Sequence, residues 1–351
     1  MKLGLNILSA KSANAKHHQP HSHLYWRLKI IALTGLMIMG CGAGNGQFHQ
    51  QRVLTGRFAE QEIEVDNQTR YFTAVQPDSY ETGKPAVVLL HGGTQSMRKV
   101  LGRNTTTKRW LELAERDGFL LLVPNGVNFR GNDAYGDRQS WNDLRPGRDR
   151  RRSRADDVAF IKAVVDWATQ EQGIDRSRVY VTGASNGGMM ALRLLVELPE
   201  YFAAAAVFSA SLPQNEIPYP AQGTPIMIMN GTDDPLVPWE GGTVSQGADP
   251  VRSIEATVDY WIRINGANRS AAAKNTLSNN SSTDGCKITE TSYPTPGSQL
   301  PVVLFYRVEG GGHSIPAIDP PRYPPAIQQR IGRQCQDVNG VDLAWEFMKN
   351  F

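Results

Sequence analysis

The stretch GASNGGM, residues 183–189, follows directly on the apolar run RVYV at 178–181. Its serine, Ser185, stands between glycines placed two positions before it and two positions after it. This spacing is typical of a tight strand-to-helix turn, which holds its central residue at positive φ and crowds the flanking positions. The stretch therefore predicts a buried strand, a raised serine and a helix. The alternative is an accidental match in a chain with 33 glycines, and the rest of the sequence has to decide.

Apolar runs of strand length recur along the chain and alternate with amphipathic stretches. The runs are PAVVLLHGG (85–93), FLLLVPNG (119–126), AAAAVFSA (203–210), TPIMIMNG (224–231) and PVVLFYRV (301–308). Helices are expected at 105–118, where Gly118 ends the pattern, at 156–170, at 253–264 and at 343–351, and a strand pair at 52–58 and 69–77. Buried strands alternating with helices predict an α/β fold with a mostly parallel sheet covered on both faces. No repeat or linker divides residues 41–351, so we expect a single domain there.

The first forty residues differ from the rest of the chain. They carry five lysines and arginines and no acidic residue, and they include the apolar run IIALTGLMIMG at 30–40. This run has the length of a signal-peptide core and ends before Cys41 in a pattern that resembles a bacterial lipobox. We interpret residues 1–40 as an export signal and Cys41 as a lipidation site that would attach the protein to a membrane. Plain secretion and an uncleaved anchor are the alternatives.

Removing that segment changes the charge and the candidate catalytic residues. The formal net charge of +3 becomes −2 without the five positive charges, so nothing indicates a nucleic-acid partner. Of the seven histidines, only His49, His91 and His313 remain. Cys286 and Cys335 remain as an even pair in an exported chain, which predicts a disulfide; two separate buried thiols are the alternative.

Polar stretches follow four of the apolar runs. They are HGG (91–93), GASNGG (183–188), NGTDDPLVP (230–238) and EGGGHS (309–314). Reactive groups in a parallel sheet gather beyond the carboxyl ends of its strands. A serine nucleophile needs a base, and the base needs an acid to orient it. Ser185, Asp234 and His313 supply these groups in the chain order of α/β-hydrolases, with Asp233 as the alternative to Asp234.

The tetrahedral intermediate of such a reaction needs N–H donors for its oxyanion. We expect one from the backbone of Asn186 and another from the loop after PAVVLLHGG, at Gly93 with Thr94 next. His91 then fixes this loop and is not the base. A long loop at 127–155 and a second at 267–287 are predicted to be irregular. The first contains Trp141, a candidate substrate contact, and the six arginines between 145 and 154, which fit a solvated loop better than an anion site.

Four segments together resemble a known family. They are LLHGG, the long stretch from DDVAF to MMALRL (156–194), NGTDDPLVPW and VEGGGHSIP. The resemblance is to the polyhydroxybutyrate-depolymerase-like esterases, which include bacterial lipoprotein esterases and the feruloyl and acetylxylan esterases of the first carbohydrate esterase family. It runs from about residue 54 to the C-terminus and implies the α/β-hydrolase fold. The pattern Gly-x-x-Asp-x-x-Val-Pro places the acid at Asp234, and the adjoining Trp239 is a second candidate substrate contact.

The sequence thus predicts a serine esterase that forms an acyl-enzyme on Ser185. The resemblance implies an ester substrate, either a feruloyl or acetyl ester of a polysaccharide or a hydroxyalkanoate polyester. No metal cluster, phosphate loop or dinucleotide fingerprint appears in the sequence, so we expect no cofactor and no metal. Two other functions remain open: a serine peptidase of the prolyl-oligopeptidase kind, and a non-catalytic glycan-binding lipoprotein.

Overall fold

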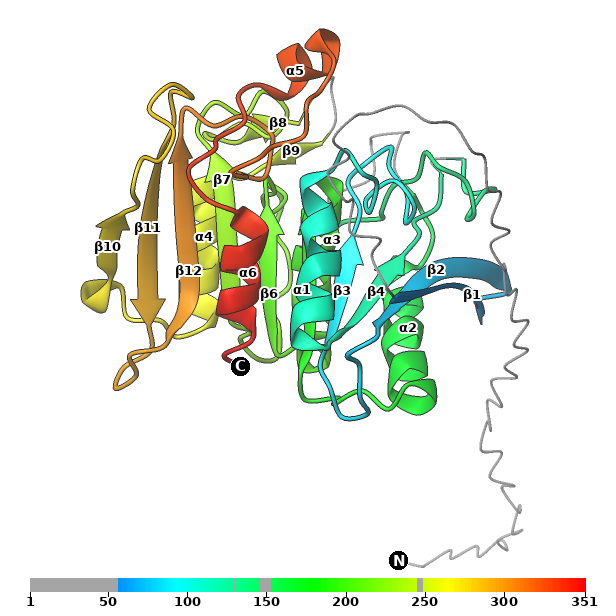
Figure 1. The fold of residues 1–351 in the computed structure, drawn as a ribbon. Coiled ribbons are helices and arrows are strands. Elements are labelled where there is room, and N and C mark those ends of the chain that lie inside the picture. The colour runs from blue at the N-terminus through cyan, green and yellow to red at the C-terminus, as the bar shows by residue number, and fades with distance from the viewer. Residues whose placement is uncertain (1–55, 129, 146–152, 245–248) are drawn as a thin grey trace, which may run out of the picture.

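A computed structural model describes residues 56–128, 130–145, 153–244 and 249–351. The expected export segment, Cys41 and most of the arginine-rich loop lie outside these residues. The described chain forms a ten-stranded sheet in the order β1-β2-β4-β3-β5-β6-β7-β12-β11-β10 (Figure 1). Among the described residues, no helix combines the length and the apolar character needed to cross a membrane.

The middle of the sheet is parallel, as the continuous apolar runs predict. Its strands are β4 (Leu120–Pro124), β3 (Ala86–Leu90), β5 (Val179–Ala184), β6 (Ala204–Phe208), β7 (Ile226–Gly231) and β12 (Pro301–Glu309). Antiparallel strands flank this region: β1 (Gly56–Val65) and β2 (Gln68–Pro77) on one side, β11 (Lys287–Pro294) and β10 (Ala273–Thr276) on the other. A short separate ribbon pairs β8 (Gly242–Thr243) with β9 (Pro250–Val251).

Helices cover both faces of the sheet (Figure 1). One face packs against α2 (Asp157–Glu171), α3 (Asn186–Glu197) and α4 (Ile254–Ile264), and the other against α1 (Arg109–Asp117) and α6 (Gly340–Met348). Strand β3 shows why: Val88 and Leu90 belong to the first apolar core, and Val87 and Leu89 belong to the second. A strand that is apolar at every position needs a cover on both sides. The predicted α/β architecture is confirmed.

The start of α2 illustrates how adjacent acids take different roles. Asp156 caps the helix, since its carboxylate accepts the N–H of Ala159 at 2.9 Å. Asp157 is fully buried and pairs at 2.6 Å with Arg70 of β2, whose side chain is also buried. Removal of either partner would leave a buried charge without compensation, so this ion pair fixes α2 against the sheet.

Some predicted elements differ from those observed. The first strand of the predicted pair continues to Val65, well beyond the expected end at residue 58. The predicted loop at 267–287 contains the short 3-10 turn Arg269–Ala271 and edge strand β10. Helix α5 (Pro325–Ile331) was not predicted from the sequence; it has no buried residue and lies beyond the end of the sheet in Figure 1.

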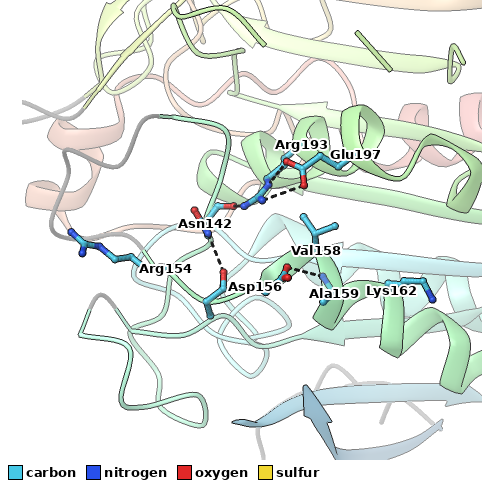
Figure 2. A pocket seen from close by; sticks show the side chains of 9 residues that line it. Asn142, Arg154, Asp156, Val158, Ala159, Lys162, Arg193 and Glu197 are labelled. Carbon is cyan, nitrogen blue, oxygen red and sulfur yellow. Dashed lines mark hydrogen bonds and ion pairs between the residues drawn. The ribbon is translucent and has the colours of Figure 1, made fainter. Parts of the chain in front are cut away.

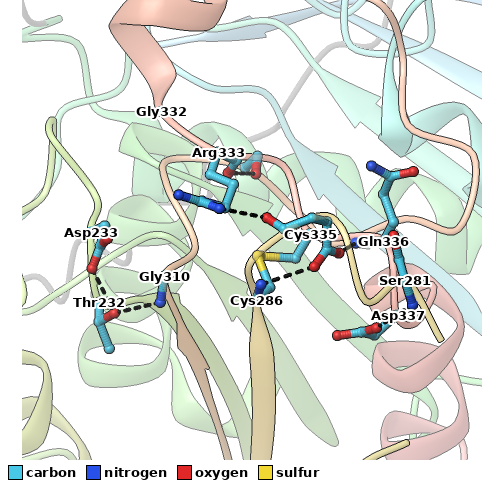
Figure 3. The surroundings of a disulfide bond; sticks show 12 residues. Thr232, Asp233, Ser281, Cys286, Gly310, Gly332, Arg333, Cys335, Gln336 and Asp337 are labelled. Carbon is cyan, nitrogen blue, oxygen red and sulfur yellow. Dashed lines mark hydrogen bonds between the residues drawn. A yellow bond between two sulfur atoms is a disulfide. The ribbon is translucent and has the colours of Figure 1, made fainter. Parts of the chain in front are cut away.

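The predicted disulfide between Cys286 and Cys335 is present, with 5.7 Å between the two Cα atoms. It joins the residue immediately before β11 to the segment that follows α5 (Figure 3). Both half-cystines are buried. The bond therefore fixes a segment that has little regular structure of its own to the edge of the sheet.

Candidate active site

The turn at Ser185 lies where the order of the sheet reverses. From β3 the chain proceeds to β4 on one side and then to β5 on the other, so the ends of β3 and β5 face the same crevice. Ligands of open α/β sheets bind at such a switch point. Ser185 follows β5 with φ 57° and ψ −127°, and helix α3 begins at the next residue. The predicted strand, raised serine and helix are confirmed.

Gly183 and Gly187 are required by steric contacts on either side of this turn. A Cβ on Gly183 would lie 2.6 Å from the backbone carbon of Gly187. A Cβ on Gly187 would lie 2.4 Å from the carbonyl oxygen of Leu90 and 2.5 Å from that of His91. The two glycines therefore allow β3, β5 and α3 to pack closely together. This packing permits the sharp turn that carries Ser185.

His313 and Asp234 form the second part of the site. Nδ1 of His313 lies 2.7 Å from Oδ2 of Asp234, whose side chain is fully buried. The other carboxylate oxygen of Asp234 accepts the backbone N–H groups of Leu236 and Val237, both at 2.8 Å. Asp233 is exposed and accepts a bond from the hydroxyl of Thr232. The geometry therefore favours Asp234 as the partner of His313.

Ser185 and His313 line one cavity of about 410 Å³. One part of its wall is polar and comes from the loop after β3 and from residues 105–107. Another part is apolar and is formed by Met189, Leu236, Val244, Ile315, Ile327 and Ile331. A concave site with an apolar wall and a few directed polar groups suits a small organic ligand.

Two of the three expected oxyanion donors are available. Within the described residues, neither the N–H of Gly93 nor that of Asn186 donates to a protein acceptor, and both residues line the cavity. The N–H of Thr94 donates to the carbonyl of Gln139 at 2.7 Å. The expectation that Thr94 donates to an oxyanion is therefore wrong, because its only backbone donor is already used.

His91 is buried within the loop that carries Gly93. Its Nε2 accepts the N–H of Gly126 at 3.0 Å, and its Nδ1 lies 2.9 Å from the carbonyl of Gly92, to which it donates in the matching tautomer. Burial lowers the pKa of His91 to about 4. A neutral imidazole with both nitrogens engaged has no capacity to serve as the base, so His91 holds the loop as expected.

Neither candidate tryptophan reaches the cavity. Trp141 is fully buried and donates its indole N–H to the carbonyl of His91 at 2.8 Å. Trp239 is 8% exposed and packs against Phe305 and the guanidinium of Arg307. The interpretation of both as substrate contacts is wrong, because their side chains are enclosed by protein.

Comparison with known proteins identifies the family. Residues 73–248, half of the chain, match the family described as phospholipase/carboxylesterase. The chain belongs to this family. Its α/β-hydrolase fold follows from the same match, and the protein is a serine ester hydrolase. Ser185 and Asp234 lie inside the matched range, and His313 lies beyond it.

Individual proteins similar to this esterase carry related names. A protein of Nocardia uniformis subsp. tsuyamanensis named as the esterase NocK is 30% identical over 76% of this chain and 74% of its own. An Aspergillus oryzae protein named as a feruloyl esterase C is 27% identical over 61% of this chain and 73% of its own. Among solved structures, an acetyl xylan esterase from Aspergillus awamori aligns over 74% of this chain and 93% of its own, with 19% identity and a TM-score of 0.46.

Several residues that line the cavity of the esterase were not predicted from the sequence. Tyr323, Ile327, Arg330 and Ile331 come from α5 and the segment before it. Arg145 also lines the cavity and forms a buried ion pair with Asp143, 2.7 Å between Nη2 and Oδ2. A short helix without an apolar stripe has no periodicity to detect, so the sequence pattern did not indicate α5. Its position in the chain, shortly after His313, was the one available signal that it could line the cavity.

A second hollow of about 490 Å³ lies along α2 and α3 of the esterase (Figure 2), and Ser185 is not among the residues that line it. Its cationic side chains include Lys162, paired with Asp166 at 2.7 Å, and Arg193, paired with Glu197 at 2.7 Å. Arg193 also donates to the carbonyl of Asn142 at 2.6 Å. The two ion pairs each lie within one helix, and the bond to Asn142 fixes α3 to the loop after β4. Among the described residues that line it, the hollow has no nucleophile paired with a base. The candidate chemistry therefore belongs to the Ser185 cavity.

Proposed function

We propose that this esterase hydrolyses carboxylic esters through an acyl-enzyme on Ser185, with His313 as general base and Asp234 as the residue that orients it. The observation that carries the proposal is that Ser185, raised on a strained turn, shares a cavity with His313, whose other side is held at 2.7 Å by a buried carboxylate. A nucleophile, a base and an orienting acid are the three groups that serine hydrolysis requires.

The steps follow from these positions. His313 takes the proton of the Ser185 hydroxyl as its oxygen attacks the ester carbonyl, and the Asp234 carboxylate stabilises the imidazolium that forms. The N–H groups of Asn186 and Gly93 donate to the negative oxygen of the tetrahedral intermediate. When the intermediate collapses, His313 returns the proton to the departing alcohol. Water, activated by the same base, then releases the acid from Ser185. No step needs a cofactor or a metal.

The proposed substrate is an ester with an apolar or small acyl group on a polar alcohol. The apolar wall of the cavity fits the acyl group, and the polar wall at Gln95 and residues 105–107 fits a hydroxylated alcohol. The name of one relative, a feruloyl esterase C, agrees with this choice. A hydroxyalkanoate polyester is the second substrate class that the sequence motifs favour.

We also propose that the enzyme works outside the cytoplasm. Residues 1–40 have the composition of an export signal, and Cys41 stands where a lipid would attach. The disulfide between Cys286 and Cys335 supports export, because such bonds persist in oxidising compartments.

The test is turnover of methyl ferulate, acetylated xylan and a hydroxybutyrate oligomer, each with and without a serine-reactive phosphonate. Ser185→Ala should lower turnover by about 10⁴-fold or more, abolish labelling and leave the melting temperature nearly unchanged. A matched control is Ser209→Ala, since Ser209 also has positive φ after a strand, β6, but does not line the cavity.

Each result has a distinct meaning. Hydrolysis by Ser185→Ala at the wild-type rate would overturn the proposal. Preference for a dipeptidyl amide over every ester would support the peptidase alternative. A wild-type protein that neither hydrolyses these esters nor takes up the phosphonate would support the glycan-binding alternative.

A further inference from the structure

We propose that Trp141 is a positioning residue that sets the relative placement of the two oxyanion donors, the N–H groups of Gly93 and Asn186. This inference rests on the proposed function and deepens it. Trp141 lies in the loop after β4, and its contacts reach both the loop after β3 and the start of α3. It is a buried residue that is hydrogen-bonded to both of these segments.

The first connection is to the loop that carries Gly93. The indole Nε1 of Trp141 donates to the carbonyl oxygen of His91 at 2.8 Å, and the indole and imidazole rings are 4.6 Å apart between centroids. The His91 carbonyl belongs to the peptide plane immediately before Gly92. Holding this oxygen therefore fixes the plane from which the chain continues to Gly93.

The second connection is to Asn186. The backbone N–H of Trp141 donates to Oδ1 of Asn186 at 2.7 Å, and the backbone carbonyl of Trp141 accepts from Nδ2 at 3.2 Å. Nδ2 also donates to a carboxylate oxygen of Asp143 at 2.8 Å. Both atoms of the Asn186 amide are thus held by the segment 141–143, so the first residue of α3 has a fixed orientation.

The two connections meet at a close backbone contact. The carbonyl oxygen of His91 lies 2.5 Å from the position that a Cβ of Gly187 would occupy. The oxygen is therefore packed against the first turn of α3 while the indole N–H holds it from the other side. If the indole bond is lost, this carbonyl is left buried without its donor and its peptide plane has reason to rotate.

Such a rotation would weaken the oxyanion site without touching the substrate or the nucleophile. Trp141 is fully buried and does not line the cavity, so its loss should leave KM nearly unchanged. Loss of one oxyanion donor costs about 10²- to 10³-fold in kcat, and a displaced donor costs less than a missing one. We expect Trp141→Phe to lower kcat by about 10- to 100-fold.

The chain offers a matched control in Trp110. This tryptophan is also fully buried, lies in α1 on the other face of the sheet, and has an indole N–H without a hydrogen-bond acceptor in the described part of the chain. Trp110→Phe therefore removes a similar buried volume and an indole N–H that makes no bond. Its kcat should stay within about twofold of wild type.

The experiment measures kcat and KM separately for wild type, Trp141→Phe and Trp110→Phe, together with the rate of phosphonate labelling at Ser185. The expected result is a lower kcat and slower labelling at constant KM in Trp141→Phe alone. Equal losses in both tryptophan variants, or a rise in KM at unchanged kcat, would overturn the proposal.

A second variant covers the case in which Trp141→Phe does not fold. Benzothienylalanine at position 141 keeps the shape of the indole and replaces its N–H by sulfur, so the same fall in kcat is expected from loss of the hydrogen bond. A wild-type kcat in this variant would refute the positioning role. If the wild-type protein itself neither hydrolyses esters nor labels at Ser185, the proposed function fails instead.

Discussion

Asp233 and Asp234 are neighbours whose side chains have opposite surroundings. The turn buries the Asp234 carboxylate, supplies it with two backbone N–H groups and directs its second oxygen to His313. Asp233 faces solvent beside Thr232. A base-orienting carboxylate has to be fixed and shielded from water, and one of the two meets both conditions.

The two asparagine variants of these residues should therefore differ widely in rate. Asp234→Asn replaces an acceptor for His313 by an amide and favours the wrong imidazole tautomer, which should lower kcat by about 10³- to 10⁴-fold. Asp233→Asn, the matched control, should change kcat by less than about twofold, because an exposed carboxylate outside the site is removed. Steady-state kinetics on one ester decides the matter, and the reverse order of effects would move the acid to Asp233.

At the residue scale, the sequence predicts the candidate catalytic residues better than the contacts that hold the surrounding loops in place. Ser185, Asp234 and His313 follow strand ends in a diagnostic order, so spacing alone brings them together. The sequence does not show that the Thr94 N–H is occupied by Gln139, or that Trp141 points inward. Both facts depend on contacts with other loops, which no local pattern encodes.

At the scale of elements, His91 links the ends of two adjacent strands. It follows β3, and its Nε2 accepts the N–H of Gly126 in the loop after β4. The bond requires an unprotonated nitrogen, and burial lowers the pKa of His91 from the ordinary 6.5 to about 4. The connection between these two loops is therefore sensitive to pH.

The sign of this dependence follows from proton binding in the two states. Below about pH 6.5 the unfolded chain protonates His91, whereas the folded chain keeps it neutral down to about pH 4. The free energy of unfolding should therefore fall as pH drops through this window, by about 2 kcal/mol between pH 7.5 and 5 from this residue. Urea unfolding of wild type and His91→Gln at both pH values measures it.

Comparison of the two proteins isolates the histidine from other titrating groups. Carboxylates contribute equally to both, so they cancel in the difference between the two pH dependences. The variant, although less stable at pH 7.5, should lose less stability on acidification. An identical loss in both proteins would contradict the lowered pKa of His91.

Helices and strands with a buried face can be predicted from the sequence, and those without one cannot. The strands of the parallel centre are continuous apolar runs because both faces are covered, and α2 and α4 have clear caps and apolar stripes. Edge strand β10, AKNT, is exposed at all four positions, and α5 buries none of its residues. Elements without a buried face leave no periodic signal, although α5 contributes to the wall of the cavity.

At the scale of the whole molecule, the sheet and the disulfide together place His313. The loop that carries His313 is hydrogen-bonded to the end of α5 and to the segment after it. The N–H of His313 donates to the carbonyl of Ile331, the last residue of α5, at 2.6 Å, and the N–H of Gly312 donates to the carbonyl of Arg333 at 2.9 Å. Arg333 in turn donates to the carbonyl of Asp284, two residues before Cys286 (Figure 3). His313, the proposed base, is therefore supported by a segment that the disulfide ties to the sheet.

Breaking the disulfide should consequently lower both stability and turnover. Cys286 and Cys335 are 49 residues apart, and closing a loop of that length restricts the unfolded chain by about 4 kcal/mol in the entropic account. Cys286→Ser combined with Cys335→Ser should lower the free energy of unfolding by up to about this amount. Under conditions where the variant stays folded, kcat should also fall, because the support of His313 is loosened.

Urea unfolding and steady-state kinetics of the double variant and the oxidised wild type measure the two effects separately. The wild type treated with reductant serves as the second comparison, since it has the native side chains without the bond and should resemble the double variant. The melting temperature defines the range in which both proteins are folded and their kcat values comparable. An unchanged urea midpoint would show that the bond adds no stability. A lower midpoint with an unchanged kcat would show that the segment after α5 holds His313 in place without the disulfide.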